Sequence, residues 1–342
     1  MYNKHIPEIN KTIKRTGKAI VSIGCSFVQA QGAFNDELYE KYQWDYPGVG
    51  HPLRIKISNT EKFELLKKYP DLLKPDPDHL LDFTFMEYEN AFVNVLCKKY
   101  FNGEYAPINL GLRGCGNRAS IKELYFRPEI DWENIKELIV VYMPSGMERF
   151  DFVNDLWPEH FHWKAMWPND VETPATAREH LWKGYNKSLY SEKFSVIEQL
   201  GHMQELATWC KLHNAKLIIT PGFDRRYDKE YFEAELSMSV ERDVEGTLKQ
   251  VSAPGFFSYD HSKDHKLLSK LWPWDNMFKP DGFKTFADLA MSRETSVEDK
   301  TDFFFQFLGK RSPNGWMTPC AHPGAKAHDL FASLLYNHIK TL

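Results

Sequence analysis

Four short, nearly continuous apolar runs punctuate the chain, and a glycine or proline closes or follows each of them. Runs of this length are typical of parallel strands that are covered on both faces. Residues 79–100 and 189–213, which lie between the runs, have the character of helices, and a last amphipathic stretch ends the chain. Strands that alternate with helices predict an α/β fold with a parallel sheet and right-handed crossovers. The predicted strands are residues 18–24, 106–111, 136–143 and 214–222.

Three spans fit this alternation poorly, and we interpret them as large, partly aromatic-rich insertions. Residues 40–78 are broken by prolines and glycines, residues 151–185 are loop-like and dense in Trp and His, and residues 223–315 have no clean period. The 342 residues are enough for one large α/β domain with insertions, or for two small domains. We expect a single domain over residues 1–342, in which the insertions form a cap or an interface.

Composition narrows the class of protein. The formal net charge of −4 creates no field that would favour nucleic acid or an acidic membrane surface. No apolar run reaches the length of about 18 residues that a membrane span needs, and the polar N-terminus lacks the apolar core of a secretory signal. The five cysteines include no C-x-x-C pair, which argues against a zinc site or a disulfide framework. We therefore expect a cytoplasmic protein with no cofactor, no metal, no nucleic-acid partner and no membrane partner; a homo-oligomer stays open.

Ligands of parallel sheets bind beyond the carboxyl ends of the strands, so the candidate chemistry should lie in the loops at that edge. Ser26 follows the first strand, where the chain turns into a helix. Such a turn exposes the hydroxyl group beside a helix N-terminus, whose free N–H groups favour developing negative charge. This makes Ser26 a candidate nucleophile. The alternative is a helix N-cap, which is a common role of serine.

The second loop, residues 109–117, is rich in glycine. Gly114 could donate its backbone N–H to an oxyanion, and the Asn117 carboxamide could be a second donor. A tight turn in which Asn117 caps the next helix is the structural alternative. A phosphate cradle is a weaker one, because no Lys-Ser/Thr pair follows the glycines.

The remaining loops offer one candidate base and three candidate binding or orienting residues. Ser145 could contact substrate, and Arg149 could bind a carboxylate or phosphate, although an orienting or structural role is favoured for it. Asp224 is better explained as a solvated charge. His322 precedes the last helix and could act as general base to Ser26 if the sheet brings the two together, although a lone histidine is more often packed or solvated.

Taken in order, these loops resemble the motifs of the SGNH (GDSL-type) hydrolases. They read GCSF at 24–27, NLGLRGCGN at 109–117, VVYMPSGMER at 140–149 and HPGAKAH at 322–328. GCSF and the S-x-x-x-R turn look especially like the divergent SGNH-like proteins of tailed bacteriophages, which would place the protein in the host cytoplasm or the virion. The resemblance implies a flavodoxin-like doubly wound sheet. It also implies a nucleophile at Ser26, a base at His322, and an oxyanion held by the N–H groups of Ser26 and Gly114.

The sequence departs from the family pattern at three positions. Where the family has an Asp after the first glycine of the motif, this sequence has Cys25. The family's oxyanion Asn, which follows the third strand, falls on Ser145, so that donor is absent or comes from Asn117. The acid expected three residues before the histidine is Pro319. An acid there normally orients the imidazole, and losing it can cost about four decades in rate. A distant carboxylate such as Asp224 could substitute, or the site is a Ser–His dyad, or activity is lost.

Three functions remain open at this point. The first is an esterase or deacetylase acting on an O-acylated carbohydrate, because abundant aromatic rings suit the apolar faces of sugars. The second is a catalytically weak or inactive SGNH scaffold that binds a glycan or a protein partner. The third is acyl transfer to a sugar by the same residues. A thiol of Cys25, Cys115 or Cys320 is a further, less favoured nucleophile, since small buried cysteines are commonly packing residues.

Overall fold

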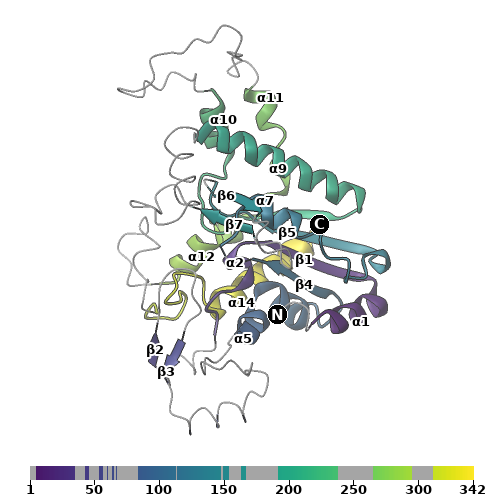
Figure 1. Ribbon diagram of the computed structural model, residues 1–342, viewed down its shortest axis with the longest axis vertical. Helices are drawn as coiled ribbons and strands as arrows, with labels where there is room; N and C mark the ends of the chain where they lie inside the picture. Colours follow the sequence, from purple (N-terminus) through teal and green to yellow (C-terminus); the bar gives the residue numbers. More distant parts are fainter. Residues whose placement is uncertain are drawn as a thin grey trace.

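The centre of the molecule is a parallel β-sheet flanked by helices (Figure 1). Large parts of the three expected insertions lie outside the residues that the structure describes. The computed structural model describes residues 5–34, 43–45, 54–56, 60, 64, 67, 84–112, 114–147, 149–153, 163–166, 192–237, 265–294 and 311–342.

All four predicted strands are present and pair in parallel, in the order β4-β1-β5-β8. In chain order, the second parallel strand therefore lies beside the first, and the third and fourth follow on the other side. Gly24 pairs with both Gly111 and Met143, so the carboxyl ends of three neighbouring strands are level. The strands are β1 (Lys18–Gly24), β4 (Ala106–Gly111), β5 (Glu137–Met143) and β8 (Lys216–Ile219).

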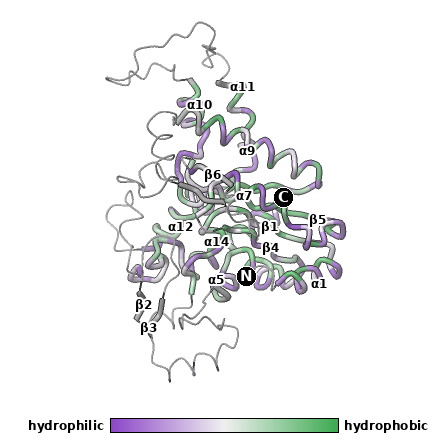
Figure 2. The backbone as a smooth tube through the Cα atoms, in the orientation of Figure 1, coloured by the Kyte–Doolittle hydropathy of each residue, from purple (hydrophilic) through white to green (hydrophobic). Residues whose placement is uncertain are grey.

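Helices cover both faces of this sheet, which confirms the predicted α/β class and is compatible with a doubly wound arrangement. Alternate residues of β1 point to opposite sides: Val21 packs with α1 (Ile6–Thr16) and α9 (Glu192–Leu212), whereas Ile20 packs with α14 (Ala325–Ile339). Hydrophilic and hydrophobic stretches alternate along α1 in Figure 2, as expected for a helix with one buried face. The other α-helices are α2 (Ser26–Gln29), α5 (Thr84–Asn90), α6 (Phe92–Val95), α7 (Asn117–Lys122), α10 (Lys229–Ser237), α11 (His265–Ser269) and α12 (Phe286–Ser292).

The single helix predicted over residues 79–100 is divided. Within the described residues, α5 ends at Asn90, Ala91 adopts an extended backbone, and α6 continues into a π-helical turn at Leu96–Tyr100. The break has a tertiary cause. The N–H of Phe92 donates to the imidazole Nδ1 of His328 on α14, at 3.2 Å, and so needs no helical carbonyl.

The span 223–315 is not only an insertion, because parts of it complete the scaffold. Met277 forms an isolated parallel bridge with Ile219 at the open edge of β8, where a fifth strand would pair. The N–H of Phe278 donates to the carbonyl of Ile219 at 2.7 Å. Phe286 and Leu289 of α12 are fully buried in the same core as α14. Short 3-10 helical turns lie at Trp132–Asn134, Trp274–Asn276 and Pro280–Gly282.

Two antiparallel hairpins occur in spans that the sequence pattern describes as irregular or loop-like. One joins β2 (Gln43–Asp45) to β3 (Arg54–Lys56), and the other joins β6 (Phe150–Val153) to β7 (Trp163–Met166). Each strand has only three or four residues, which is too short to show a period in the sequence. No helix within the described residues is long and apolar enough to cross a bilayer.

Candidate active site

Ser26 lies at the turn from β1 into α2, and the structure argues against its being a helix cap. The N-cap position of α2 belongs to Cys25, and no side chain caps this helix. Gly24 is required at the turn, because a Cβ atom there would lie 2.5 Å from the carbonyl oxygen of Met143. Ser26 is therefore the first residue of α2, where its backbone N–H has no acceptor within the helix. Ser26 as a whole is 5% exposed.

The Ser26 hydroxyl meets His322 across 296 residues of sequence. The Ser26 Oγ lies 2.6 Å from the His322 Nε2, and the His322 Nδ1 lies 2.7 Å from the carbonyl oxygen of Cys320. A carbonyl oxygen can only accept a hydrogen bond, so Nδ1 carries the proton and Nε2 accepts from the serine hydroxyl. This is the tautomer that a general base to Ser26 requires.

His322 sits at the end of a tight hairpin. The N–H of Thr318 donates to the carbonyl of His322 at 2.8 Å, and Met317 pairs with Pro323. Between them, Ala321 closes the loop in the left-handed region, with φ of 60°. The imidazole packs on the ring of Phe27, one residue beyond Ser26, with centroids 4.8 Å apart. The hairpin thus places the histidine beside the turn from β1 into α2.

Glu294 organises the segment that leads into this hairpin, and sequence reasoning missed it. Its buried carboxylate accepts from the Ser312 hydroxyl at 2.5 Å, from the Trp316 N–H at 3.0 Å and from the Asn314 N–H at 3.2 Å. Three hydrogen bonds to one loop make Glu294 a structural anchor. No local signal identifies it, because the partners lie about twenty residues away in a span without periodicity.

The glycine-rich loop packs tightly against the turn from β1 into α2. A Cβ atom on Gly111 would lie 2.5 Å from the backbone nitrogen of Gln29 in α2. The Cys115 thiol contacts the carbonyl of Gly24 at 3.6 Å. Gly114 is exposed and has φ of 66°, the left-handed backbone that favours glycine, with open space where a side chain would be. The N–H of Gly114 stays the predicted oxyanion donor.

Asn117 does not fit the predicted role of oxyanion donor. Its Oδ1 accepts from the Ser145 N–H at 2.7 Å, and its Nδ2 donates to the Tyr227 hydroxyl at 2.6 Å and to the Ser145 carbonyl at 3.4 Å. Both N–H groups of the carboxamide are thereby engaged. Ser145 is fully buried, and its hydroxyl donates to the Cys115 carbonyl at 3.3 Å rather than facing a substrate. Both residues join the glycine-rich loop to the loop after β5.

Asp224 is neither a solvated charge nor the acid behind His322. It is 6% exposed, accepts from the Met147 N–H at 3.0 Å, and pairs with Arg226, whose Nη2 lies 2.7 Å from the Asp224 Oδ2. The Nη1 of Arg149 donates to the Cys115 carbonyl at 2.9 Å, and the guanidinium lies over the Phe223 ring, so the described contacts of Arg149 are with the protein itself. We call Asn117, Ser145, Arg149 and Asp224 together the loop clamp.

The three cysteines placed at the candidate site by sequence are buried thiols. Cys320 donates to the Gln31 carbonyl at 3.5 Å, and Cys115 contacts Ser120 as well as Gly24. None of these contacts pairs a thiol with an imidazole. Elsewhere, burial raises the pKa of the Cys210 thiol to about 12, which is the behaviour of an inert packing cysteine.

A second histidine, His328, lies one turn into α14 and has a different environment. It is fully buried between aromatic rings, stacked on Phe92 and edge-on to Phe286. Burial lowers its pKa to about 3, and the nearby His322 adds to the shift. His328 is therefore a neutral packing residue that accepts from the Phe92 N–H.

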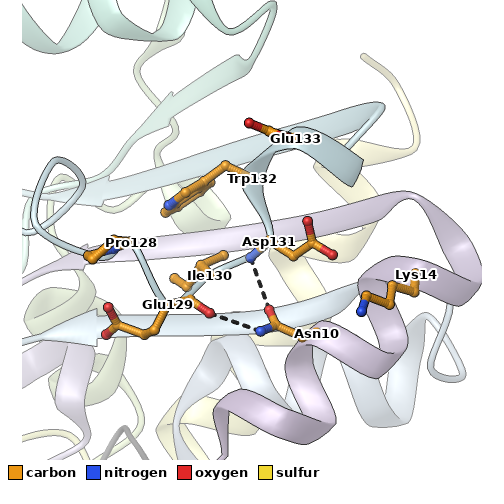
Figure 3. A pocket seen from close by; sticks show the side chains of 8 residues that line it. All are labelled: Asn10, Lys14, Pro128, Glu129, Ile130, Asp131, Trp132 and Glu133. Carbon is orange, nitrogen blue, oxygen red and sulfur yellow. Dashed lines mark hydrogen bonds between the residues drawn. The ribbon is translucent and has the colours of Figure 1, made fainter.

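A separate hollow of about 550 Å³ lies between α1 and the loop that leads into β5 (Figure 3). The Asn10 carboxamide holds this loop, donating to the Glu129 carbonyl at 2.9 Å and accepting from the Asp131 N–H at 3.0 Å. Because the loop enters the amino end of β5, the hollow lies away from the carboxyl edge that carries Ser26. Its lining includes Trp132 and charged side chains but no serine, cysteine or histidine.

Within the part of the chain that the structure describes, no three His, Cys, Asp or Glu side chains are grouped as a metal site would require. Comparison of the chain with protein-family models, with curated proteins and with solved structures gave no match. The geometry of Ser26 and His322 is therefore the main indication of function.

Proposed function

We propose that this chain is a serine ester hydrolase of the SGNH type, in which Ser26 is the nucleophile and His322 is the general base. The observation that carries the proposal is the 2.6 Å separation of the Ser26 Oγ and the His322 Nε2, with Nδ1 held by the Cys320 carbonyl. The order of the parts supports it: a nucleophile after the first strand, a glycine loop after the second, and a base before the last helix.

The proposed reaction proceeds through an acyl-enzyme. The Ser26 oxygen attacks the acyl carbon while its proton passes to the His322 Nε2, and the leaving alcohol then takes that proton. Water repeats the sequence on the acyl-serine, again with Nε2 as the base, and releases the acid. The N–H groups of Ser26 and Gly114 are the proposed donors to the tetrahedral oxyanion.

The imidazolium formed in each step is stabilised here by a carbonyl dipole in place of a carboxylate. A backbone carbonyl fixes the ring and its tautomer, but it carries no full negative charge. An acid in this position is worth up to about four decades in rate. We therefore expect a working but slow Ser–His dyad with activated esters as its best substrates.

An O-acylated carbohydrate is the proposed natural substrate class. Aromatic residues make up 15% of the chain, and rings stack on the apolar faces of sugars. One partly exposed ring, Phe223, lies 5.3 Å from Phe27, which in turn packs on His322. We propose that a sugar bound at Ser26 would contact the Phe223 ring.

The test is hydrolysis of p-nitrophenyl acetate by the purified chain and by Ser26→Ala. We expect hydrolysis by the unmodified protein and only the uncatalysed background with Ser26→Ala. Equal rates of hydrolysis in the two proteins would contradict the proposal. Release of acetate from an acetylated oligosaccharide, measured with the same two proteins, tests the substrate class.

A second candidate is an inactive SGNH scaffold that binds a glycan or a protein partner. Two observations favour it: Ser26 and His322 are only 5% and 9% exposed, and Pro319 stands where the family has its acid. A fluorophosphonate reagent separates the two candidates, because it reacts with an activated serine. Stoichiometric labelling at Ser26 contradicts the inactive scaffold, and absence of labelling contradicts the hydrolase.

A further inference from the structure

The hairpin that carries His322 contains a strained residue whose position bears on the base. Thr318 and His322 pair through their backbones, and the three residues between them form the hairpin loop. Loops of this length commonly end in the left-handed region, where glycine is preferred. Here that residue is Ala321, with φ of 60°. An alanine in this region costs about 1 kcal/mol, so other contacts must maintain the conformation.

The strained peptide is also the one that orients the base. The carbonyl of Cys320 belongs to the peptide unit that joins Cys320 to Ala321, and this carbonyl accepts from the His322 Nδ1 at 2.7 Å. Rotation of that peptide unit would take Ala321 out of the left-handed region and turn the carbonyl away from the imidazole. Local strain and correct orientation of His322 are therefore coupled at one bond.

Thr318 makes the contacts that oppose this rotation. Its Oγ1 accepts from the backbone N–H of His322 at 3.2 Å and lies 3.1 Å from the Cys320 Sγ. Thr318 is 1% exposed, so water does not compete for these bonds. Since the Cys320 thiol donates to the Gln31 carbonyl, the consistent assignment is that the Thr318 hydroxyl donates to Cys320 sulfur.

The same group of contacts joins the hairpin to the nucleophile. Gln31 donates its N–H to the carbonyl of Ser26 at 3.1 Å, so the Cys320 contact reaches the helix that carries Ser26. Gly32 packs against both hairpin side chains: a Cβ atom there would lie 2.8 Å from the Cys320 sulfur and 3.1 Å from the Thr318 hydroxyl. The distance between the Ser26 Oγ and the His322 Nε2 thus depends on how the hairpin packs against Gln31 and Gly32.

We propose that Thr318 is a positioning residue for the His322 base, and that its hydroxyl group does part of the orienting that the family assigns to the acid missing at Pro319. The inference rests on the proposed hydrolase function and deepens it. Thr318 touches neither substrate nor the reacting atoms. It acts by fixing the Cys320 carbonyl and the His322 backbone, and through them the imidazole.

The test compares Thr318→Val, which keeps the shape and removes the hydroxyl, with Thr318→Ser, which keeps the hydroxyl. For hydrolysis of p-nitrophenyl acetate, we expect Thr318→Val to lower kcat by about tenfold to a hundredfold with KM unchanged. Thr318→Ser should recover most of the loss. A matched control is Thr285→Val: Thr285 is also buried, and its hydroxyl caps α12 by accepting from the Asp288 N–H at 3.0 Å. That variant should lose stability but keep kcat.

Nitrogen-15 NMR of the His322 side chain gives a readout that does not depend on turnover. We expect one tautomer, protonated on Nδ1, in the unmodified protein and in Thr318→Ser, and a mixture of tautomers in Thr318→Val. An unchanged kcat and a single tautomer in Thr318→Val would overturn the positioning role. If the unmodified protein hydrolyses no ester, the proposed function fails on that result, and the NMR comparison alone decides whether Thr318 positions the ring.

Discussion

Two groups of polar side chains lie at the carboxyl edge of the sheet, and they use their hydrogen bonds differently. In the first group, the Ser26 hydroxyl and the His322 imidazole bond to each other, and the Nδ1 of His322 donates to the Cys320 carbonyl. In the second group, the loop clamp, Asn117 and Asp224 bond to backbone groups of neighbouring loops and to Tyr227 or Arg226. Sequence alone offered both groups as site residues.

The difference teaches how a polar residue in a site-forming loop can be assigned. A carboxamide or carboxylate whose bonds go to the backbone of other loops fixes those loops and has little capacity left for a substrate. A serine oxygen bonded to an imidazole nitrogen has a base for its proton and a lone pair for attack. The two groups should therefore respond differently to substitution, one in rate and the other in stability.

The largest expected effect is on rate, at the base. His322→Gln removes the proton acceptor while keeping a similar length of side chain. We expect ester hydrolysis to fall by about 10³-fold or more, because removal of one member of such a unit costs nearly as much as removal of all of it. The measurement is kcat/KM with p-nitrophenyl acetate. His328→Gln is the control histidine, and a comparable rate loss in that variant would erase the distinction between reactive and packed histidines.

The next effect is on stability, in the clamp. Asp224→Asn replaces an acceptor by an amide that presents N–H groups to the Met147 N–H or to Arg226. Leaving buried donors without an acceptor costs about 1–3 kcal/mol, so we expect urea unfolding to shift to lower concentration by that free energy. The rate per folded molecule should change far less than in His322→Gln. If Asp224→Asn lost as much rate as His322→Gln without losing stability, Asp224 would have a role in the reaction and not only in the loop clamp.

The third effect is a dependence of folding stability on pH, caused by the buried His328. Burial lowers the pKa of His328 to about 3 in the folded protein, against an ordinary value near 6.5. As pH falls below 6.5 the unfolded chain gains a proton that the folded chain does not, so stability is lost progressively down to pH 3. At pH 5 the loss is roughly 2 kcal/mol.

His328→Asn tests this assignment, because the asparagine oxygen can take the place of Nδ1 toward the Phe92 N–H. We expect the free energy of unfolding of this variant to depend less on pH between 6.5 and 5 than that of the unmodified protein. Some acid sensitivity should remain, since burial also lowers the pKa of His202, to about 4. Identical pH profiles in the two proteins would contradict the packed, neutral state of His328.

The smallest effect is expected at Tyr227, a buried residue that contacts the loop clamp through Asn117. Tyr227→Phe removes the hydroxyl that accepts from the Asn117 Nδ2 at 2.6 Å, while the Asn117 contacts with Ser145 remain. We expect a loss of about 0.5–1.5 kcal/mol, the usual net worth of one hydrogen bond. Chemical denaturation measures it, with ester hydrolysis as the accompanying rate. A fall in hydrolysis beyond a few-fold would indicate that Asn117 is more than a structural link.

The predictable part of this molecule is the part fixed by local pattern. The apolar run 18–24 coincides with β1, and the runs near residues 106, 137 and 216 become the other strands of the same sheet, because a continuous apolar segment has few alternatives to a buried strand. The division at Ala91 could not be predicted in the same way. It depends on His328, which is 236 residues from its partner Phe92.

The site was predictable in position but not in detail. Ser26 and His322 follow from loop order at one edge of a parallel sheet. The roles of Asn117 and Asp224 did not, because a polar residue in such a loop has the same sequence signature whether it faces a substrate or a neighbouring loop. The buried anchor Glu294 and the hydroxyl of Thr318 had no signature at all.

By itself, the sequence determined which segments become the strands of the parallel sheet, which loops reach its carboxyl edge, and that no acid stands at position 319, three residues before His322. Only the tertiary structure decided which group meets the Nδ1 of His322: the carbonyl of Cys320, turned toward it by a hairpin whose Ala321 is in the left-handed region. The physical reason is that backbone groups carry no side-chain identity. Every residue has a carbonyl, so its use as a hydrogen-bond partner is set by how the chain folds and cannot be seen in the order of residues.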